Sequence, residues 1–157
     1  NRATGQIQMG YCSFEQTWRI AIEELSTPAD RFFVRFGFGD NAAAGENVDG
    51  VYFRYSDQLN SGQWQCVCRE GNIETSVDTS VTANTNYNIF KIVVNETATE
   101  ALFYINDILV ATILTNIPST GGSFTGISCK IEKTVGATQR NLSIDYFAQK
   151  SVWPAGR

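Results

Sequence analysis

The chain has 157 residues, of which 43% are hydrophobic and 18% are charged, and it carries a formal net charge of −4. This length and composition exclude a disordered segment and predict one folded domain over residues 1–157. The acidic balance, without clustered Lys or Arg, argues against a nucleic-acid partner, because phosphate binding requires such clusters. No apolar run reaches the roughly 18 residues that a membrane-spanning helix needs, so we expect no membrane insertion.

Short runs in which apolar and polar residues alternate recur along the chain, separated by Gly, Asn, Asp, Ser or Thr. Such alternation is typical of half-buried strands. No convincing helical stripe interrupts the runs, so the sequence predicts an all-β fold: an antiparallel two-sheet β-sandwich or jelly roll of about eleven strands. Its core is expected over about 6–150, with an irregular tail at 151–157. In chain order, the predicted strands occupy about 6–14, 18–23, 32–38, 51–55, 63–69, 72–78, 88–95, 100–106, 108–115, 123–133 and 141–149.

Three short segments have the composition of tight turns. In Ile105-Asn106-Asp107-Ile108, two residues that tolerate a left-handed backbone separate two apolar runs, as a two-residue hairpin requires. The segments 60–62 (Asn-Ser-Gly) and 70–72 (Glu-Gly-Asn) are predicted turns because Gly adopts positive φ without a Cβ clash. These turns predict a meander in which neighbouring strands along the chain pair with each other.

The four cysteines are interpreted mainly as small buried hydrophobic residues of a protein assembled in a reducing compartment. Cys66 and Cys68 stand two apart in a predicted strand, so both side chains leave the same face and do not bridge each other. A Cys-x-Cys spacing without any histidine in the chain also fits no common zinc site. A disulfide between Cys12 and Cys129 stays open as the alternative.

The sequence contains no histidine, which removes the commonest general base and excludes serine-histidine and cysteine-histidine triads. Glycosidases can work with two carboxylates alone, so the acidic groupings matter. The three nearest are Glu23 with Glu24, Glu46 with Asp49, and Glu74 with Asp78. Only the last pair shares a strand face, and solvated charges on an outward face are the ordinary explanation. We therefore predict no catalytic residues and a protein that is not an enzyme.

One loop carries enough oxygen ligands to be considered for calcium, since hard cations need several convergent oxygens. Its order matches no EF-hand, and an ordinary turn-forming loop is the favoured interpretation, so we predict no cofactor and no metal ligands. The residues considered are Asp40, Asn41, Glu46, Asn47 and Asp49.

A protein that binds sugars without catalysis commonly holds the sugar ring against an aromatic side chain and fixes its hydroxyl groups with a few polar groups. Two alternatives remain open: Trp64 can belong to the core, and Arg54 can pair with Glu74 or another carboxylate across strands. The candidate glycan-binding residues of the middle strands are Tyr52, Arg54, Trp64, Arg69 and Tyr87.

Five segments together resemble a known family. They are residues 50–57 (GVYFRYSD), 61–69 (SGQWQCVCR), 103–112 (FYINDILVAT), 115–118 (TNIP) and 142–146 (LSIDY). These segments, in this order along the chain, resemble those of the concanavalin A-like lectin/glucanase-type jelly-roll domains of bacteriophage tail fibres, tailspikes, capsid fibres and decoration proteins. The resemblance covers about residues 30–150, and the chain lacks the Glu-x-Asp-x-x-Glu run of the catalytic relatives.

This resemblance implies a non-enzymatic module on a virion surface, assembled in the host cytoplasm. Such a module acts through contacts with other virion proteins, with host cell-surface polysaccharide as a further partner. It also implies a homo-oligomer, for which a trimer is one option. A stand-alone carbohydrate-binding lectin is the first alternative, and a glycoside hydrolase or polysaccharide lyase is the second.

Overall fold

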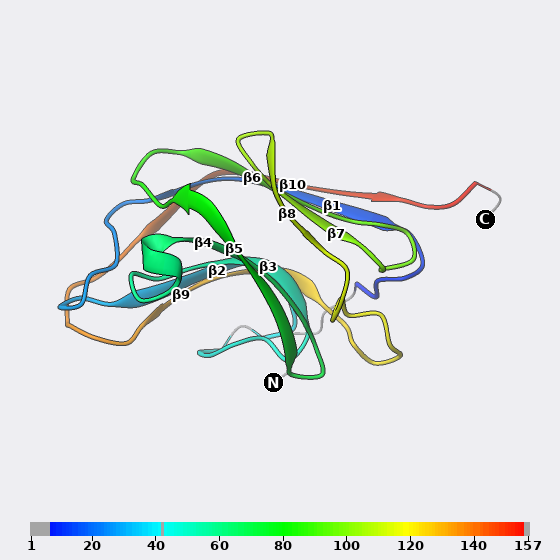
Figure 1. Cartoon of the computed structure of the whole chain (residues 1–157), viewed down its shortest axis with the longest axis horizontal. Coiled ribbons are helices and arrows are strands. Elements are labelled where there is room, and N and C mark those ends of the chain that lie inside the picture. The colour runs from blue at the N-terminus through cyan, green and yellow to red at the C-terminus, as the bar shows by residue number, and fades with distance from the viewer. Residues whose placement is uncertain (1–6, 42, 156–157) are drawn as a thin grey trace.

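The computed structural model describes residues 7–41 and 43–155 as two antiparallel five-stranded sheets packed face to face (Figure 1). We call β10-β1-β6-β7-β8 the back sheet, because it holds the first and last strands, and β5-β4-β3-β2-β9 the front sheet. The back-sheet strands are β1 (Ser13–Ile22), β6 (Asn88–Val94), β7 (Ala101–Ile105), β8 (Ile108–Ile113) and β10 (Leu142–Val152). The front-sheet strands are β2 (Phe32–Gly39), β3 (Gly50–Tyr55), β4 (Gln63–Glu70), β5 (Ile73–Thr82) and β9 (Gly126–Lys133).

Aromatic side chains from both sheets meet between the layers and form the centre of the core. Phe36 of β2 packs edge-on against Phe90 of β6 with ring centroids 5.0 Å apart, and Trp64 of β4 lies 4.7 Å from the same Phe90 ring. Each of these residues belongs to the inward set of an alternating strand, so the period-two pattern places them together. The predicted two-sheet antiparallel sandwich is confirmed.

The predicted turns adopt the left-handed backbone that their residues favour. Asn106 and Asp107 have φ of 51° and 64° and connect β7 to β8. Gly71 and Asn72, at 57° and 70°, connect β4 to β5 in the same way. The turn at Asn60–Gly62 is a single 3-10 turn, η1, immediately before β4.

The described residues form ten strands, one fewer than the sequence predicts. The run predicted at 6–14 is not a separate strand: Ile7 makes an isolated bridge to Thr125, Gly10 takes φ of +91°, and the strand β1 begins at Ser13. Residue 6 lies outside the described part of the chain. At the other end, β10 continues to Val152, two residues into the segment predicted to be irregular.

Three of the four cysteines are buried, as the sequence predicts, and the fourth is exposed. Cys66 and Cys68 both face the core from β4 and are fully buried. Cys12 is also buried, whereas Cys129 is exposed on the edge strand β9, and no disulfide joins these two residues. The alternative of a Cys12–Cys129 bridge is therefore not realised.

Candidate functional site

The outer face of the front sheet carries a row of arginines that the strand register brings side by side. Arg35 on β2 lies opposite Arg54 on β3, and Arg54 lies opposite Gln65 on β4. Their chain neighbours, among them Phe36 and Phe53, point into the core, so alternation turns the arginines outward. Both arginines are nevertheless almost fully covered, with 4% and 7% of their surface exposed.

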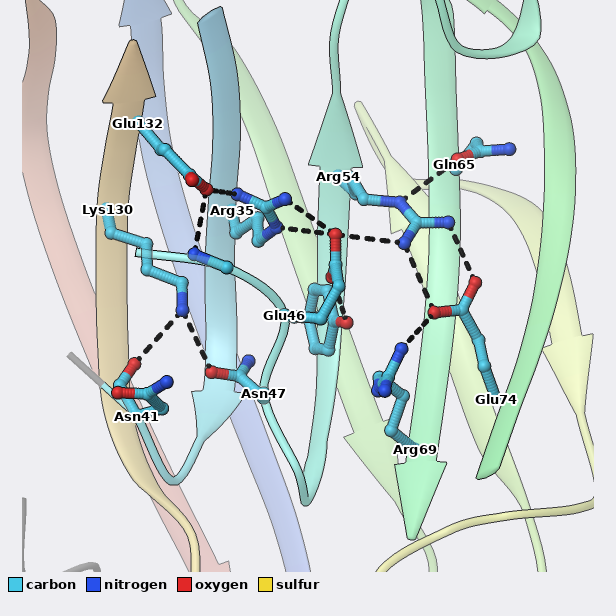
Figure 2. Close-up of polar contacts among 12 residues, drawn as sticks. Arg35, Asn41, Glu46, Asn47, Arg54, Gln65, Arg69, Glu74, Lys130 and Glu132 are labelled. Atoms are coloured by element: carbon cyan, nitrogen blue, oxygen red, sulfur yellow. Dashed lines mark hydrogen bonds and ion pairs between the residues drawn. The ribbon is translucent and has the colours of Figure 1, made fainter. Parts of the chain in front are cut away.

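A single carboxylate, that of Glu46 in the segment between β2 and β3, joins the two arginines (Figure 2). Its Oε1 accepts from Arg35 Nη2 at 2.6 Å and from Arg35 Nε at 3.0 Å, and lies 3.2 Å from Arg54 Nη1. Its Oε2 accepts a hydrogen bond from the Tyr52 hydroxyl at 2.6 Å. Burial alone would raise the pKa of Glu46, but the bonds from Arg35 and Tyr52 and the charge of Arg54 lower it to about 2.

Each arginine also has a partner on a strand, independent of Glu46. Arg35 Nη1 donates to Glu132 Oε2 of β9 at 2.8 Å. Arg54 donates from Nη2 to Glu74 Oε1 of β5 at 2.8 Å and from Nε to Gln65 Oε1 at 3.1 Å. We call Arg35, Arg54, Arg69, Glu46, Glu74 and Glu132 the arginine network (Figure 2).

Arg69 extends this network along β4. Its Nη1 donates to Glu74 Oε2 at 2.7 Å, so Glu74 bridges two arginines as Glu46 does. Burial would raise the pKa of Glu74, but the hydrogen bond and charge of Arg54 and those of Arg69 lower it instead. The face therefore presents three arginines that are paired with two carboxylates of the sheet, Glu74 and Glu132, and with Glu46 of the segment between β2 and β3.

Polar contacts hold the segment that carries Glu46 against the sheet. Lys130 of β9 donates from Nζ to the backbone carbonyl oxygens of Asn41 and Ala43 at 3.2 and 3.1 Å, and to Asn47 Oδ1 at 3.3 Å. The backbone N–H of Gly45 donates to Glu132 Oε2 at 2.9 Å. Figure 2 shows Lys130 and Glu132 reaching this segment from the strand beside Arg35.

The structure brings three of the five predicted glycan-binding residues together. Tyr52, Arg54 and Arg69 all lie on the outer face of the front sheet. Trp64 is 2% exposed and packs in the core, which is the alternative that the sequence left open. Tyr87 is exposed beside the back sheet, with the guanidinium of Arg19 4.8 Å from its ring centroid. The predicted alternative pairing of Arg54 with Glu74 is confirmed.

Sequence reasoning did not find Arg35, Lys130 or Glu132, and it considered Glu46 only in an acidic pair with Asp49 and as a calcium ligand. Arg35 was visible as the single charge within the aromatic run 32–38, at a position opposite in phase to the core residues Phe36 and Phe38. That phase indicates an outward arginine. Its partners lie 11 and 97 residues away in the chain, so no local pattern reveals them.

The oxygen-rich loop does not gather its side chains around one point. Asp40 Oδ1 accepts from the backbone N–H of Val48 at 3.0 Å, and Asp49 Oδ1 accepts from Gly71 N–H at 2.8 Å. Glu46 and Asn47 contact the arginines and Lys130. In the described part of the chain, no three acidic or cysteine side chains are grouped as a metal site would require.

No helix among residues 7–41 and 43–155 combines the length and the hydropathy needed to cross a membrane. The two packed antiparallel sheets define a jelly-roll β-sandwich. Residues 15–145 match the model of the SO2946-like, C-terminal domain family, and the chain belongs to this family. No curated protein matches the sequence.

Solved structures share the fold at low sequence identity. Sheep galectin-11 in complex with glycerol is 13% identical with a TM-score of 0.51, over 92% of this chain and 93% of that one. The alginate lyase AlyC3 in complex with dimannuronate is 7% identical with a TM-score of 0.57, over 98% and 70%. A receptor binding domain is 18% identical with a TM-score of 0.52, and this chain spans 31% of its length. These similarities extend to lectins and lyases alike.

Proposed function

We propose that the protein is a non-enzymatic saccharide-binding module whose ligand lies on the outer face of the front sheet. The observation that carries the proposal is the row of Arg35, Arg54 and Gln65 in one cross-strand register, with Tyr52 and Arg69 on the same face. Fixed guanidinium and amide groups suit ligands rich in oxygen acceptors. Structural similarity to a galectin and to a lyase complexed with dimannuronate supports the proposal at the level of the fold.

The protonation states on this face favour binding over catalysis. Glu46 has a pKa of about 2 and is ionised at neutral pH, so it has no proton to donate as a general acid. Burial and the neighbouring charge of Glu46 raise the pKa of Tyr52 above its ordinary value, which keeps the phenol protonated. A general acid–base catalyst works best when its pKa lies near the working pH, and neither group meets that condition.

A glycan array followed by calorimetric titration tests the proposal. We expect binding to a subset of saccharides, with at least a tenfold loss of affinity in Arg69→Gln, since Arg69 donates two hydrogen bonds to the protein whereas Arg35 and Arg54 donate three each. Arg19→Gln on the back sheet is the matched control and should bind as the wild type does. Absence of any saccharide signal, or equal losses in both variants, would contradict a front-sheet site.

Turnover is measured on the same ligands. We expect no cleavage of any bound polysaccharide by the wild type. Cleavage that disappears in Glu74→Gln would instead establish a glycoside hydrolase or lyase.

A second candidate is a structural role on a virion surface, acting through protein contacts. Apolar side chains left exposed on the two edge strands favour it: Ile127 of β9 is 57% exposed and Ile144 of β10 is 47% exposed, although both are on the core-facing side of their strands. Such residues mark contact surfaces in many proteins. Light scattering should then show a trimer or another closed oligomer that Ile127→Ser and Ile144→Ser disrupt, whereas a monomer at high concentration would oppose this role.

A further inference from the structure

Arg35, Arg54 and Tyr52 together form a receptor for one carboxylate. Their donors reach the two oxygens of Glu46 from adjacent strands, at distances between 2.6 and 3.2 Å. Two of the three side chains are charged, all three are nearly covered, and all three are fixed in place by a β-sheet. A preorganised pair of guanidinium groups with a phenol is suited to a carboxylate, because charge-assisted hydrogen bonds are the stronger kind.

We propose that Glu46 occupies this receptor as an internal stand-in, and that Arg35, Arg54 and Tyr52 take the carboxylate of an acidic saccharide, a uronic-acid residue, in its place. This inference rests on the proposed saccharide-binding function and names its ligand class.

The receptor keeps its shape when Glu46 leaves, because its arginines are held from the strands. Glu132 continues to hold Arg35, while Glu74 and Gln65 continue to hold Arg54. Glu46 differs from these partners because it lies between β2 and β3, outside any strand. It is therefore the one carboxylate of the arginine network that can move away from the arginines without moving a strand.

Moving the segment that carries Glu46 takes no side chain out of the hydrophobic core. None of residues 43–49 belongs to the hydrophobic core or packs against it, and Val48 is exposed. Polar contacts hold the segment: those of Lys130, Glu132 and Glu46, and near its end the hydrogen bonds of Val48 with Asp40 and Asn72 and of Asp49 with Gly71. The last group can stay in place while residues 43–47 move. Gly45, at φ of +93° with nothing near its Cβ position, adds conformational freedom next to Glu46.

The receptor needs an anion because Arg35 and Arg54 lie directly opposite each other on neighbouring strands. Like charges directly opposite each other on neighbouring strands repel. Glu46 removes that repulsion in the free protein, and a uronate carboxylate does so equally well. A neutral sugar has no carboxylate to replace that of Glu46, so the site selects charged over neutral saccharides.

The test compares the wild type with Glu46→Ala in two measurements. In the first, melting temperature is followed as sodium glucuronate replaces sodium chloride at constant ionic strength. We expect Glu46→Ala to gain several degrees with glucuronate and nothing with glucose, whereas Arg35→Gln/Glu46→Ala gains nothing. Asp145→Ala, which removes an ion pair with Arg19 on the back sheet, is the matched control and should respond no more than the wild type does.

In the second measurement, titration compares an oligogalacturonate with a neutral oligosaccharide of the same length. Glu46→Ala should bind the oligogalacturonate with a Kd at least about tenfold lower than the wild type, because the internal carboxylate occupies the wild-type receptor for all but a small fraction of the time. Glu46→Gln, which keeps the side-chain size and removes the charge, gives the same comparison if Glu46→Ala does not fold.

The outcomes separate this inference from the proposed function. Front-sheet binding of neutral saccharides, without preference for uronates and without change in the Glu46 variants, overturns the inference and leaves the saccharide-binding function intact. No saccharide binding by any variant overturns both. Glucuronate rescue of Glu46→Ala with tighter oligogalacturonate binding supports the inference.

Discussion

Arg35 and Arg54 lie opposite each other in the register of β2 and β3, and one oxygen of Glu46 lies 2.6 Å from the first guanidinium and 3.2 Å from the second. A cross-strand pair of like charges would repel if it stood alone. The segment between the same two strands supplies the carboxylate that compensates it. The local connection of the sheet thus determines the electrostatics of its outer face.

The first prediction concerns acid stability. Because folding lowers the pKa of Glu46 to about 2, the group stabilises the folded state above its unfolded pKa, and this stabilisation is lost as the pH falls toward 2. A shift of this size corresponds to a contribution on the order of 2 to 3 kcal/mol at neutral pH. Urea unfolding of the wild type and Glu46→Gln should therefore give free energies that converge between about pH 5 and pH 2. A constant difference across that range would contradict the assignment.

The alternation of apolar and polar residues predicted the two sheets, because each strand buries one of its faces in the core. The same alternation also shows which candidate binding residues lie on one face of a strand, and the predicted set did not take this into account. Trp64 and Arg69 are five residues apart on β4 and so face opposite sides, which means that they cannot share a ligand surface. Tyr52 and Arg54, two apart on β3, share one, and the structure brings them together.

The partners of Arg35 could not be predicted, because they depend on which strands become neighbours. Glu132 reaches Arg35 only because β9, almost a hundred residues later, adds to the edge of the front sheet beside β2. Glu46 reaches it because the segment between β2 and β3 lies against the outer face of the sheet. Neither arrangement leaves a periodic pattern in the sequence.

The second prediction distinguishes the core tryptophan from the exposed tyrosine of the candidate set. Trp64→Ala should destabilise the fold by about 3 to 5 kcal/mol, since it leaves a cavity among Phe36, Phe53 and Phe90. Tyr87→Ala should change stability by no more than about 0.5 kcal/mol, because the side chain is exposed. Chemical unfolding followed by circular dichroism measures both. A stable Trp64→Ala protein would place the indole outside the core.

The third prediction concerns thiol reactivity. Burial raises the pKa of both Cys66 and Cys68, so neither thiol should react with iodoacetamide in the native state. Cys129 is exposed, and although partial burial of its thiol raises the pKa to about 11, it should be alkylated slowly and well before Cys66 or Cys68. Mass spectrometry of peptides labelled before and after unfolding identifies the sites, with Cys129→Ser as the control that removes the native label. Native labelling of Cys66 or Cys68 would show that β4 opens.

The fourth prediction concerns the hairpin between β7 and β8. Asn106 has φ of 51°, and its Oδ1 accepts from the backbone N–H of Ile89 at 2.9 Å, so Asn106→Val loses the bond and strains the backbone. We expect a loss of about 1 to 3 kcal/mol in thermal or urea unfolding. Asp107→Gly, at φ of 64°, is the matched substitution in the same turn and should be close to neutral, because Gly accepts this conformation. Equal losses in both variants would contradict a conformational cause.

The fifth prediction is a double-mutant cycle across the arginine network. Arg35→Gln alone should cost about 3 to 5 kcal/mol, because it leaves the covered carboxylates of Glu46 and Glu132 with fewer partners. Glu46→Gln alone should cost about 2 to 3 kcal/mol, as in the first prediction. The double variant should cost less than the sum, with a coupling energy of about 1 to 3 kcal/mol. The exposed pair Arg19 and Asp145 on the back sheet is the matched cycle, and its coupling should stay below about 1 kcal/mol. If the two cycles gave the same small coupling in urea unfolding, the carboxylate of Glu46 would not be bound by Arg35 in solution, and the receptor on the front sheet would be open without it.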